Sequence, residues 1–441
     1  MNLFRRFGRG TLAAGEILSD LSRAQAKWEL DLSKTILSKR KKWLLLALMP
    51  IILGVGMEIA FASSLPEHIG GHKAYMPSFA TGSMFIGSIF VGIMAGLITG
   101  VIGAGGGYVL TPALMSIGVK GIMAVGTDQF HLFAKAIMGT VIHRKMGNVN
   151  VWIAVWFVLG SVFGASSGGV LNRAIYQKSP ALSDAFISAV YVVMLGILGA
   201  YAFYDWVSTR KSAADTGAHG GPASDSLPKM ARWLQGIPAK PRVKFDEDIT
   251  PGGRSISVYP LIVCGFIVGF VASIMGVGGG FLTFPMFVYG LGVSTFTTVG
   301  TDILQIIFTT AYSSITQYAV YGYVFYSVAM GMLLGSLLGV QVGALVTKTV
   351  KGSQIRAFYA LTIIAGFVNR SCALPGKLND AGWVSVNPAI SHAIDQVGIF
   401  VFFVLVTFFS VWIIAAFFKG VGKMRAAERL ALKNGTATAG H

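Results

Sequence analysis

Two short glycine-rich stretches decide how this chain folds: Gly103-Ala104-Gly105-Gly106-Gly107 and Gly276-Val277-Gly278-Gly279-Gly280. Each follows an apolar run, at residues 82–102 in the first case and 259–275 in the second, and each precedes a half-length apolar segment. A helix cannot continue stably through four glycines in five residues, because each glycine costs about 1 kcal/mol relative to alanine. The backbone must therefore turn at both places.

The surroundings of the two stretches also repeat, which indicates an internal duplication. When Gly103 is placed on Gly276, three further sets of residues coincide, the first directly and the other two after one or two extra residues in the second copy. They are Pro112 with Pro285, Gly126-Thr127-Asp128 with Gly300-Thr301-Asp302, and the ladder Gly160-Gly164-Gly168 with Gly335-Gly339-Gly343. We therefore predict two copies of one unit, at residues 82–206 and 259–372. The ladders are expected to pack helices of the two copies closely together.

The composition places this duplication in a membrane. Of the 441 residues, 54% are hydrophobic and 12% are charged, and the mean hydropathy is +0.67, whereas an ordinary soluble domain carries roughly 25% charged residues. This excludes a water-soluble globular enzyme. The net charge of +17 does not indicate nucleic-acid binding, because the basic residues stand between apolar runs. The two cysteines exclude a disulfide scaffold and a CxxC metal site, and we expect no cofactor.

The apolar runs predict an all-α polytopic membrane protein, because a helix crosses the hydrocarbon core with about 20 apolar residues. We expect about eight full spans and two re-entrant hairpins that turn at the glycines. The full spans are expected at 43–62, 122–142, 151–171, 185–206, 296–320, 327–347, 356–372 and 397–418. Each repeat would then hold one hairpin and three spans, so that the second copy is inverted relative to the first. Against the hairpins, the run 82–102 is long enough for a full span.

The basic residues near the span ends predict the orientation of the chain. Residues 39–42 are all basic, so the N-terminus is expected on the cytoplasmic side. The membrane itself is expected to be the inner membrane of the cell. The basic C-terminal tail is expected there too. The segments outside the repeats are an amphipathic N-terminal segment (1–42), a first span with its external loop (43–81), a cytoplasmic linker (207–258), an external loop (373–396), a last span (397–418) and the tail (419–441).

The glycine stretches are candidates for binding an anion. Inside a bilayer, non-helical backbone is tolerated only where it is buried in protein or lines a cavity. Glycines can direct bare N–H groups at an anion, and the short helix that follows adds the positive end of its dipole. The candidate residues are Gly105, Gly106, Gly107, Gly278, Gly279 and Gly280. Close packing through glycine would explain a single stretch, whereas two stretches in one register favour a site between the repeats.

Three ionisable residues share one face of the span 122–142, namely Asp128, His131 and Lys135. Ionisable groups in membrane helices are costly and usually face a cavity or a partner. Lys135 is interpreted as the countercharge of an anion or as the partner of Asp128. His131 can exchange protons near neutral pH, although a hydrogen-bonding role alone would also explain it. Asp128 and Asp302 lie near expected helix starts, so capping is an alternative for both.

The second repeat has Gln305 and Thr309 where the first has His131 and Lys135. One half would therefore provide charge and a titratable group, and the other would provide neutral hydrogen bonds. Besides the glycines, the residues expected to bind substrate are Thr127, Lys135, Thr301, Gln305 and Thr309. Such a set suits a small oxyanion. The sequence contains no HExxH motif and no clustered cysteine and histidine ligands, so we predict no catalytic centre and no metal site.

The duplicated glycine stretch with its proline and its Gly-Thr-Asp, at 103–128 and 276–302, resembles the two halves of TauE/SafE permeases, also called the sulfite exporter or TSUP family. The likeness covers about residues 82–420. It implies a substrate among sulfite, sulfoacetate and related sulfur anions, and transport driven by the proton gradient. The amphipathic N-terminus and the linker depart from the compact members of that family.

The residues and the resemblance together predict a secondary transporter in the lipid bilayer that exports sulfite or a small organosulfonate by alternating access. Its partners would be the sulfur-containing anion and protons, with no nucleic acid. Asp128, His131 and Asp302 are the candidates for proton coupling. A passive anion channel and an uptake permease remain alternatives, and a homo-oligomer is left open.

Overall fold

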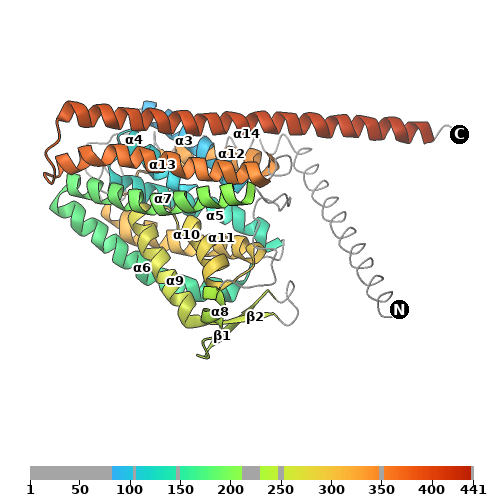
Figure 1. Ribbon diagram of the computed structural model, residues 1–441, viewed down its shortest axis with the longest axis horizontal. Helices are drawn as coiled ribbons and strands as arrows, with labels where there is room; N and C mark the ends of the chain where they lie inside the picture. The colour runs from blue at the N-terminus through green and yellow to red at the C-terminus, as the bar shows by residue number, and fades with distance from the viewer. Residues whose placement is uncertain are drawn as a thin grey trace. The chain divides into compact units, whose positions relative to one another are not determined.

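A computed structural model gives the structure of this protein and describes residues 82–102, 106–145, 149–210, 229–246, 253–346 and 352–438. The expected N-terminal segment 1–42, the first span and its loop lie outside the described residues. Within them the chain is almost entirely helical, with one two-stranded sheet. Figure 1 shows the long helices α7, α13 and α14 side by side.

The N-terminal half of the helical unit contains α3 (Gly82–Ile102), α4 (Gly107–Ser116), α5 (Gly121–Lys145), α6 (Val151–Lys178) and α7 (Pro180–Arg210). The C-terminal half contains α9 (Val258–Met275), α10 (Gly280–Pro285), the π-helix η2 (Met286–Leu291), α11 (Thr295–Tyr312), the π-helix η3 (Ser313–Tyr318), the 3-10 helix η4 (Ala319–Tyr321), α12 (Tyr326–Val346) and α13 (Gly352–Asp380). A long last helix, α14 (Pro388–Thr438), follows.

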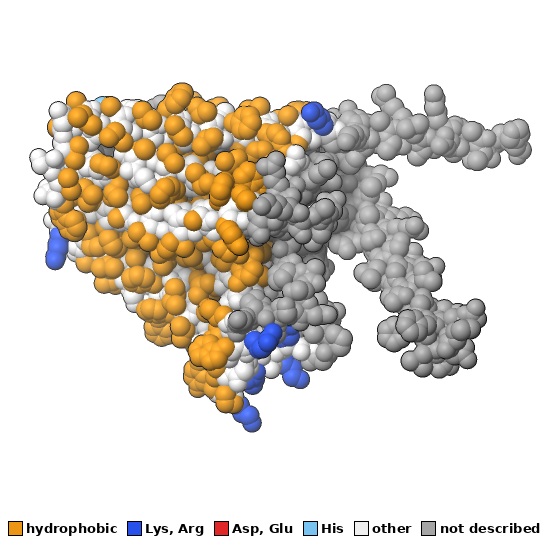
Figure 2. Space-filling view, in the orientation of Figure 1, with side chains coloured by type: hydrophobic (Ala, Val, Ile, Leu, Met, Phe, Trp, Pro, Cys, Tyr) orange, Lys and Arg blue, Asp and Glu red, His pale blue; other side chains and the backbone are white. Residues whose placement is uncertain are grey.

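Among the described residues, six helices are long and apolar enough to cross a membrane, namely α3, α6, α7, α9, α13 and α14. Two of them, α3 and α9, precede the glycine turns, where hairpins were expected. Three expected spans, on α5, α11 and α12, are not among the six; the run of α12 that qualifies as apolar is shorter, at Tyr326–Val340. Figure 2 shows apolar side chains covering the face that α6, α7, α13 and α14 present, as expected of a surface in lipid.

The glycine ladders pack helices of the two halves together, as predicted. Helix α3 lies along α12, and α6 lies along α9. A Cβ placed on Gly335 of α12 would be 2.1 Å from Ile89 O, and one placed on Gly160 of α6 would be 1.9 Å from Ile262 O. Only glycine permits backbones to approach so closely. The remaining long helices pair α5 with α11 and α7 with α13.

The backbone turns at both glycine stretches. Helix α3 ends at Ile102, and α4 begins after Gly106, whose φ is 72°. Helix α9 ends before Gly276, whose φ is 80°, and α10 begins after Gly279, whose φ is 87°. These values lie in the left-handed region that favours glycine. Of the two prolines that follow, Pro112 lies inside α4 and Pro285 ends α10 where the π-helix begins.

Part of the expected linker folds onto the membrane helices. It contains α8 (Lys229–Gln235) and the antiparallel strands β1 (Arg242–Phe245) and β2 (Arg254–Ser257), with Val243 opposite Ile256. Val243, Phe245 and Ile256 are buried in one cluster with residues of α6, η2 and α9. The apolar side chains alternate along β1, which the polar composition of the whole segment concealed.

The segment 373–396, expected as an external loop, is mostly helical. Helix α13 continues to Asp380, and α14 begins at Pro388. Basic residues in this part of α13 have partners on neighbouring helices: Arg370 Nη2, just before the expected loop, donates to Ser116 Oγ at 3.0 Å, and Lys377 Nζ lies 3.4 Å from Asp184 Oδ2. A helix can carry such residues when protein rather than lipid surrounds them. The expected tail 419–441 is also helical as far as Thr438.

Candidate functional site

The two glycine turns meet inside the molecule. A Cβ placed on Gly107 would lie 2.9 Å from Val277 Cα and 3.1 Å from Val277 O. The next residues of the two short helices, Tyr108 and Phe281, also approach each other, with ring centroids 6.4 Å apart. Gly107, Val277 and both rings are buried. The start of α4 therefore packs against the second glycine turn, in the protein interior.

Neither short helix has a side-chain cap at its start. The N-cap residues are Gly106 and Gly279, and neither helix start receives a hydrogen bond from a capping side chain. The first amides of a helix have no carbonyl partner within it, and the helix dipole adds partial positive charge there. Helix α10 continues directly into η2, so a longer helical segment stands behind its first turn. The N-terminal ends of α4 and α10 can therefore each bind a negatively charged group.

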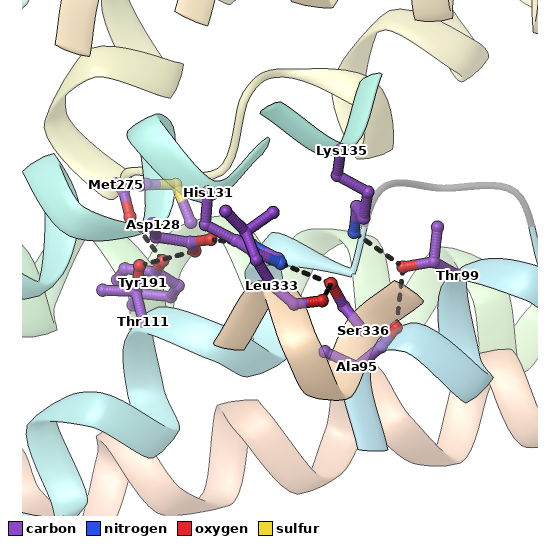
Figure 3. A network of polar contacts seen from close by, with 10 residues as sticks. All are labelled: Ala95, Thr99, Thr111, Asp128, His131, Lys135, Tyr191, Met275, Leu333 and Ser336. Atoms are coloured by element: carbon purple, nitrogen blue, oxygen red, sulfur yellow. Dashed lines mark hydrogen bonds and ion pairs between the residues drawn. The ribbon is translucent and has the colours of Figure 1, made fainter. Parts of the chain in front are cut away.

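A line of buried polar contacts runs through Asp128 and His131 on α5 (Figure 3). Thr111 Oγ1 of α4 donates to Asp128 Oδ2 at 3.0 Å. Asp128 Oδ1 faces His131 Nδ1 at 3.6 Å, and His131 Nε2 lies 2.8 Å from Ser336 Oγ of α12. Asp128, His131 and Ser336 are fully buried. This line connects the short helix α4 with α12 of the other half.

Lys135 lies beside the first glycine turn. Its Nζ donates to Thr99 Oγ1 of α3 at 3.2 Å, and Thr99 donates to Ala95 O at 2.7 Å. A Cβ placed on Gly106 would be 2.6 Å from the same Thr99 Oγ1. Lys135 is 8% exposed. Figure 3 shows its side chain extending toward α3, away from Asp128, so the structure places the ammonium at the glycine turn.

The second half has a corresponding line of polar groups, in which the amide of Gln305 and the hydroxyl of Thr309 take the places of His131 and Lys135. Gln305 Nε2 donates to Asp302 Oδ1 at 2.8 Å and to Thr283 Oγ1 of α10 at 3.4 Å. Thr309 Oγ1 donates to Gln305 Oε1 at 3.0 Å, and it lies 2.7 Å from Ser161 Oγ of α6. The sequence prediction brought Asp302, Gln305 and Thr309 together correctly on one helix face, but their role with substrate stays a prediction.

Ser161 and Ser336 are polar partners that the sequence analysis missed. Each directly follows a glycine of a ladder, Gly160 or Gly335, and that position was the available signal. Gln129 was also missed. Its Nε2 donates to Ala272 O at 3.0 Å just before the second glycine turn, while its buried Oε1 has no hydrogen-bond partner in the described part of the chain.

Thr127 and Thr301 hold the starts of long helices in the opposite half. Thr127 Oγ1 accepts from the amide of Phe325 at 2.9 Å, immediately before α12. Thr301 Oγ1 accepts from the amide of Asn150 at 3.0 Å, immediately before α6. Both threonines are fully buried. These contacts are a structural role for the repeated threonine, and the expected role in binding substrate stays a prediction.

Capping does not explain Asp128 or Asp302, because each lies about two turns inside its helix. The start of α5 is held by Asp184, whose Oδ1 accepts from Gly121 N at 2.8 Å. The start of α11 is capped by Ser294, whose Oγ accepts from Thr297 N at 3.3 Å. The carboxyl groups of Asp128 and Asp302 are therefore buried without capping the helices that carry them.

Of the glycines expected to bind an anion, Gly105 lies outside the described residues. The others are buried at the two helix starts, namely Gly106, Gly107, Gly278, Gly279 and Gly280. Among the described residues there is no group of three or more His, Cys, Asp or Glu side chains that could hold a metal ion.

Apolar helices that enclose a buried polar and ionisable centre define a polytopic membrane protein with an intramembrane site. The family model described as "Sulfite exporter TauE/SafE" matches residues 88–369. The chain therefore belongs to the TauE/SafE family of membrane transporters.

The chain is also similar to individual transporters. It is 25% identical over 264 residues to "Probable membrane transporter protein YjnA" of Bacillus subtilis, an alignment that covers 59% of this chain and 89% of the relative. It is 22% identical over 280 residues to a "Probable membrane transporter protein" of Xylella fastidiosa, covering 62% and 90%. No solved structure matches the chain.

Proposed function

We propose that this transporter exports sulfite or a small organosulfonate by alternating access, coupled to protons. The observation that carries the proposal is the contact between Gly107 and Val277, which joins the two glycine turns at one place inside the protein. Family membership supports the sulfur-containing anion as substrate.

The anion would bind where the starts of α4 and α10 meet. Uncapped helix amides donate to oxyanions, and the two dipole ends favour negative charge. The ammonium of Lys135, bound to Thr99 beside Gly106, would supply the full positive charge. The interior excludes water, so each of these interactions is stronger there than at a surface.

Alternating access would follow from two repeats of inverted topology. Equivalent helices make equivalent contacts across the halves, since α3 lies along α12 and α9 lies along α6. The contacts of Thr127 and Thr301 correspond in the same way. Inverted repeats allow one half to rock against the other around a fixed central site. The glycine ladders, which place backbone directly on backbone, provide surfaces that can slide.

Proton coupling would use the ionisable groups of α5, with Asp302 as the counterpart in the second half. A proton can drive transport only if it changes the relative free energies of the inward-facing and outward-facing states. Asp128 and His131 would meet this condition if α4 and α12 move between the two states, and their contacts with α4 through Thr111 and with α12 through Ser336 support this role.

Flux into proteoliposomes tests the proposal. Purified protein would be reconstituted with a pH gradient, and uptake of radiolabelled sulfite, sulfoacetate, thiosulfate, sulfate and taurine would be compared. We expect accumulation of a sulfur anion above its equilibrium level only when the gradient is imposed. Equilibration without accumulation would indicate the passive channel instead, and a preference for a compound without net negative charge would contradict the anion site.

A further inference from the structure

The hydrogen bonds around His131 favour one tautomer of its ring. Ser336 Oγ lies 3.3 Å from Leu333 O, one turn earlier in α12, to which it can donate its single hydrogen. It also lies 2.8 Å from His131 Nε2, where the tautomer of the ring sets which atom donates. With the Ser336 hydrogen on Leu333 O, Nε2 carries a hydrogen and donates it to Ser336 Oγ, and in a neutral imidazole the Nδ1 atom then holds a lone pair.

The other ring nitrogen faces a second acceptor. His131 Nδ1 lies 3.6 Å from Asp128 Oδ1, and both atoms are buried without another hydrogen-bond partner among the described residues. Asp128 Oδ2 is already occupied, because it accepts from Thr111 Oγ1. An ionised carboxylate has no hydrogen to donate. Without a proton between them, two buried acceptors would face each other, at the free-energy cost of two unsatisfied groups.

We propose that the pair of Asp128 and His131 holds a single proton, on Oδ1 or on Nδ1, with Thr111 and Ser336 as the residues that position the pair. The proton resides on either atom, and the net charge of the pair is zero in both cases. When the proton leaves to water, no other bond breaks, and the pair carries one negative charge. The role of this proton in transport rests on the proposed function, whereas its location follows from the hydrogen bonds.

The surrounding groups determine what the proton does to an anion. On α5, Lys135 follows one turn after His131. From α7, the Tyr191 hydroxyl points to the same region and donates to Met275 O. The contacts from α4 and α12 are the neutral hydroxyls of Thr111 and Ser336. When the pair of Asp128 and His131 holds its proton, the pair is neutral and does not offset the positive charge of Lys135. When the proton is lost, the negative charge of the carboxylate offsets the positive charge of Lys135. Proton and anion therefore bind better together, and by linkage each favours the other.

Nuclear magnetic resonance of the full chain in lipid nanodiscs tests the location of the proton without any substrate. Histidine labelled with ¹⁵N and aspartate labelled with ¹³C would be observed at neutral pH, with His131→Gln and Asp128→Asn assigning the signals. We expect a protonated Nε2, together with either a protonated Asp128 and neutral imidazole, or an ionised Asp128 and doubly protonated imidazole. A neutral imidazole beside an ionised Asp128, or an imidazole with its only hydrogen on Nδ1, would overturn the proposal.

Ser336→Ala should remove the acceptor of Nε2–H, and the His131 signal should then shift toward a mixture of tautomers. Ser336→Thr keeps the hydroxyl and should restore the original signal. Ser161→Ala is the matched control, because Ser161 follows a ladder glycine in the same way but contacts Thr309 instead of a histidine. An unchanged His131 signal in Ser336→Ala would refute the positioning role. Loss of transport alone would bear on the proposed function and leave the NMR result standing.

Discussion

Gly107 lies directly against Val277, so that the turn of one half of the molecule touches the turn of the other. A methyl group at Gly107 would be 2.9 Å from Val277 Cα, and backbone atoms cannot move aside as a flexible side chain can. This contact makes the centre of the protein sensitive to the smallest substitution.

Gly107→Ala should therefore lower the free energy of unfolding by about 1–3 kcal/mol, the usual cost of overpacking a core, and should weaken anion binding by separating the two turns. Gly87→Ala is the control, because its nearest neighbour would be Ile117 Cδ1 at 4.0 Å. Thermal unfolding in detergent and ligand titration would measure both effects. Equal stability of the two variants would contradict the close contact.

Lys135→Met should reduce anion binding by at least about tenfold while the fold persists, because methionine keeps the length and packing of the side chain but removes the charge. Lys178→Met provides the comparison, since Lys178 is exposed at the end of α6. Isothermal titration with sulfite on purified protein would separate binding from flux. Wild-type affinity in Lys135→Met would discard the countercharge role.

Thr127→Val should destabilise the protein by about 1–3 kcal/mol, because the buried amide of Phe325 loses the Thr127 hydroxyl as an acceptor. Thr301→Val should cost less, because the amide of Asn150 is only partly buried. Thr310→Val is a matched control. Its buried hydroxyl donates to Ile306 O in its own helix, so its loss leaves no amide without an acceptor. Thr127→Ser should restore most of the loss. Unfolding temperatures would rank the variants, and a similar loss in Thr310→Val would show that the effect is not specific.

Anion binding should weaken as the pH rises, because loss of the proton leaves a negative charge on the pair of Asp128 and His131, and this charge offsets that of Lys135 on the same helix. Asp128→Asn should abolish most of this pH dependence, since the amide can donate to Nδ1 but cannot ionise. We expect a change of about tenfold in wild-type affinity across the transition, within the usual range of coupling between sites. Titration of a sulfonate that stays ionised throughout would measure it. A steep profile that survives in Asp128→Asn would locate the coupling proton elsewhere, with Asp302→Asn as the next variant to compare.

Gly164→Ala and Gly339→Ala should both impair folding, because their added methyl groups would lie 2.1 Å from Phe266 O and 2.4 Å from Ile93 O. Gly199→Ala on α7 should be tolerated, as its nearest neighbour would be a side-chain atom at 3.4 Å. The yield of monodisperse protein after membrane extraction gives the first comparison. Normal yield of all three variants would show that the ladders do not set the helix spacing.

The sequence by itself determined the membrane environment, most of the helices, both glycine turns and the use of the ladders for close packing. These features depend on local chemistry: the hydropathy of a run, the cost of glycine in a helix, and the spacing that places residues on one face. The family resemblance was likewise carried by a local, duplicated motif. Because these predictions depend on local composition, they were wrong at the linker, which contains a folded β-hairpin, and at segment 373–396, which is mostly helical.

Only the tertiary structure decided which groups meet. His131 and Ser336 lie 205 positions apart in the chain, and Thr127 and Phe325 lie 198 apart, so no local pattern could pair them. Helix packing sets these distances, because the ladder glycines fix how deeply α12 lies against α3 and so where Ser336 reaches α5. The role of a buried polar group therefore depends on which partners the packing of the helices brings within hydrogen-bonding distance.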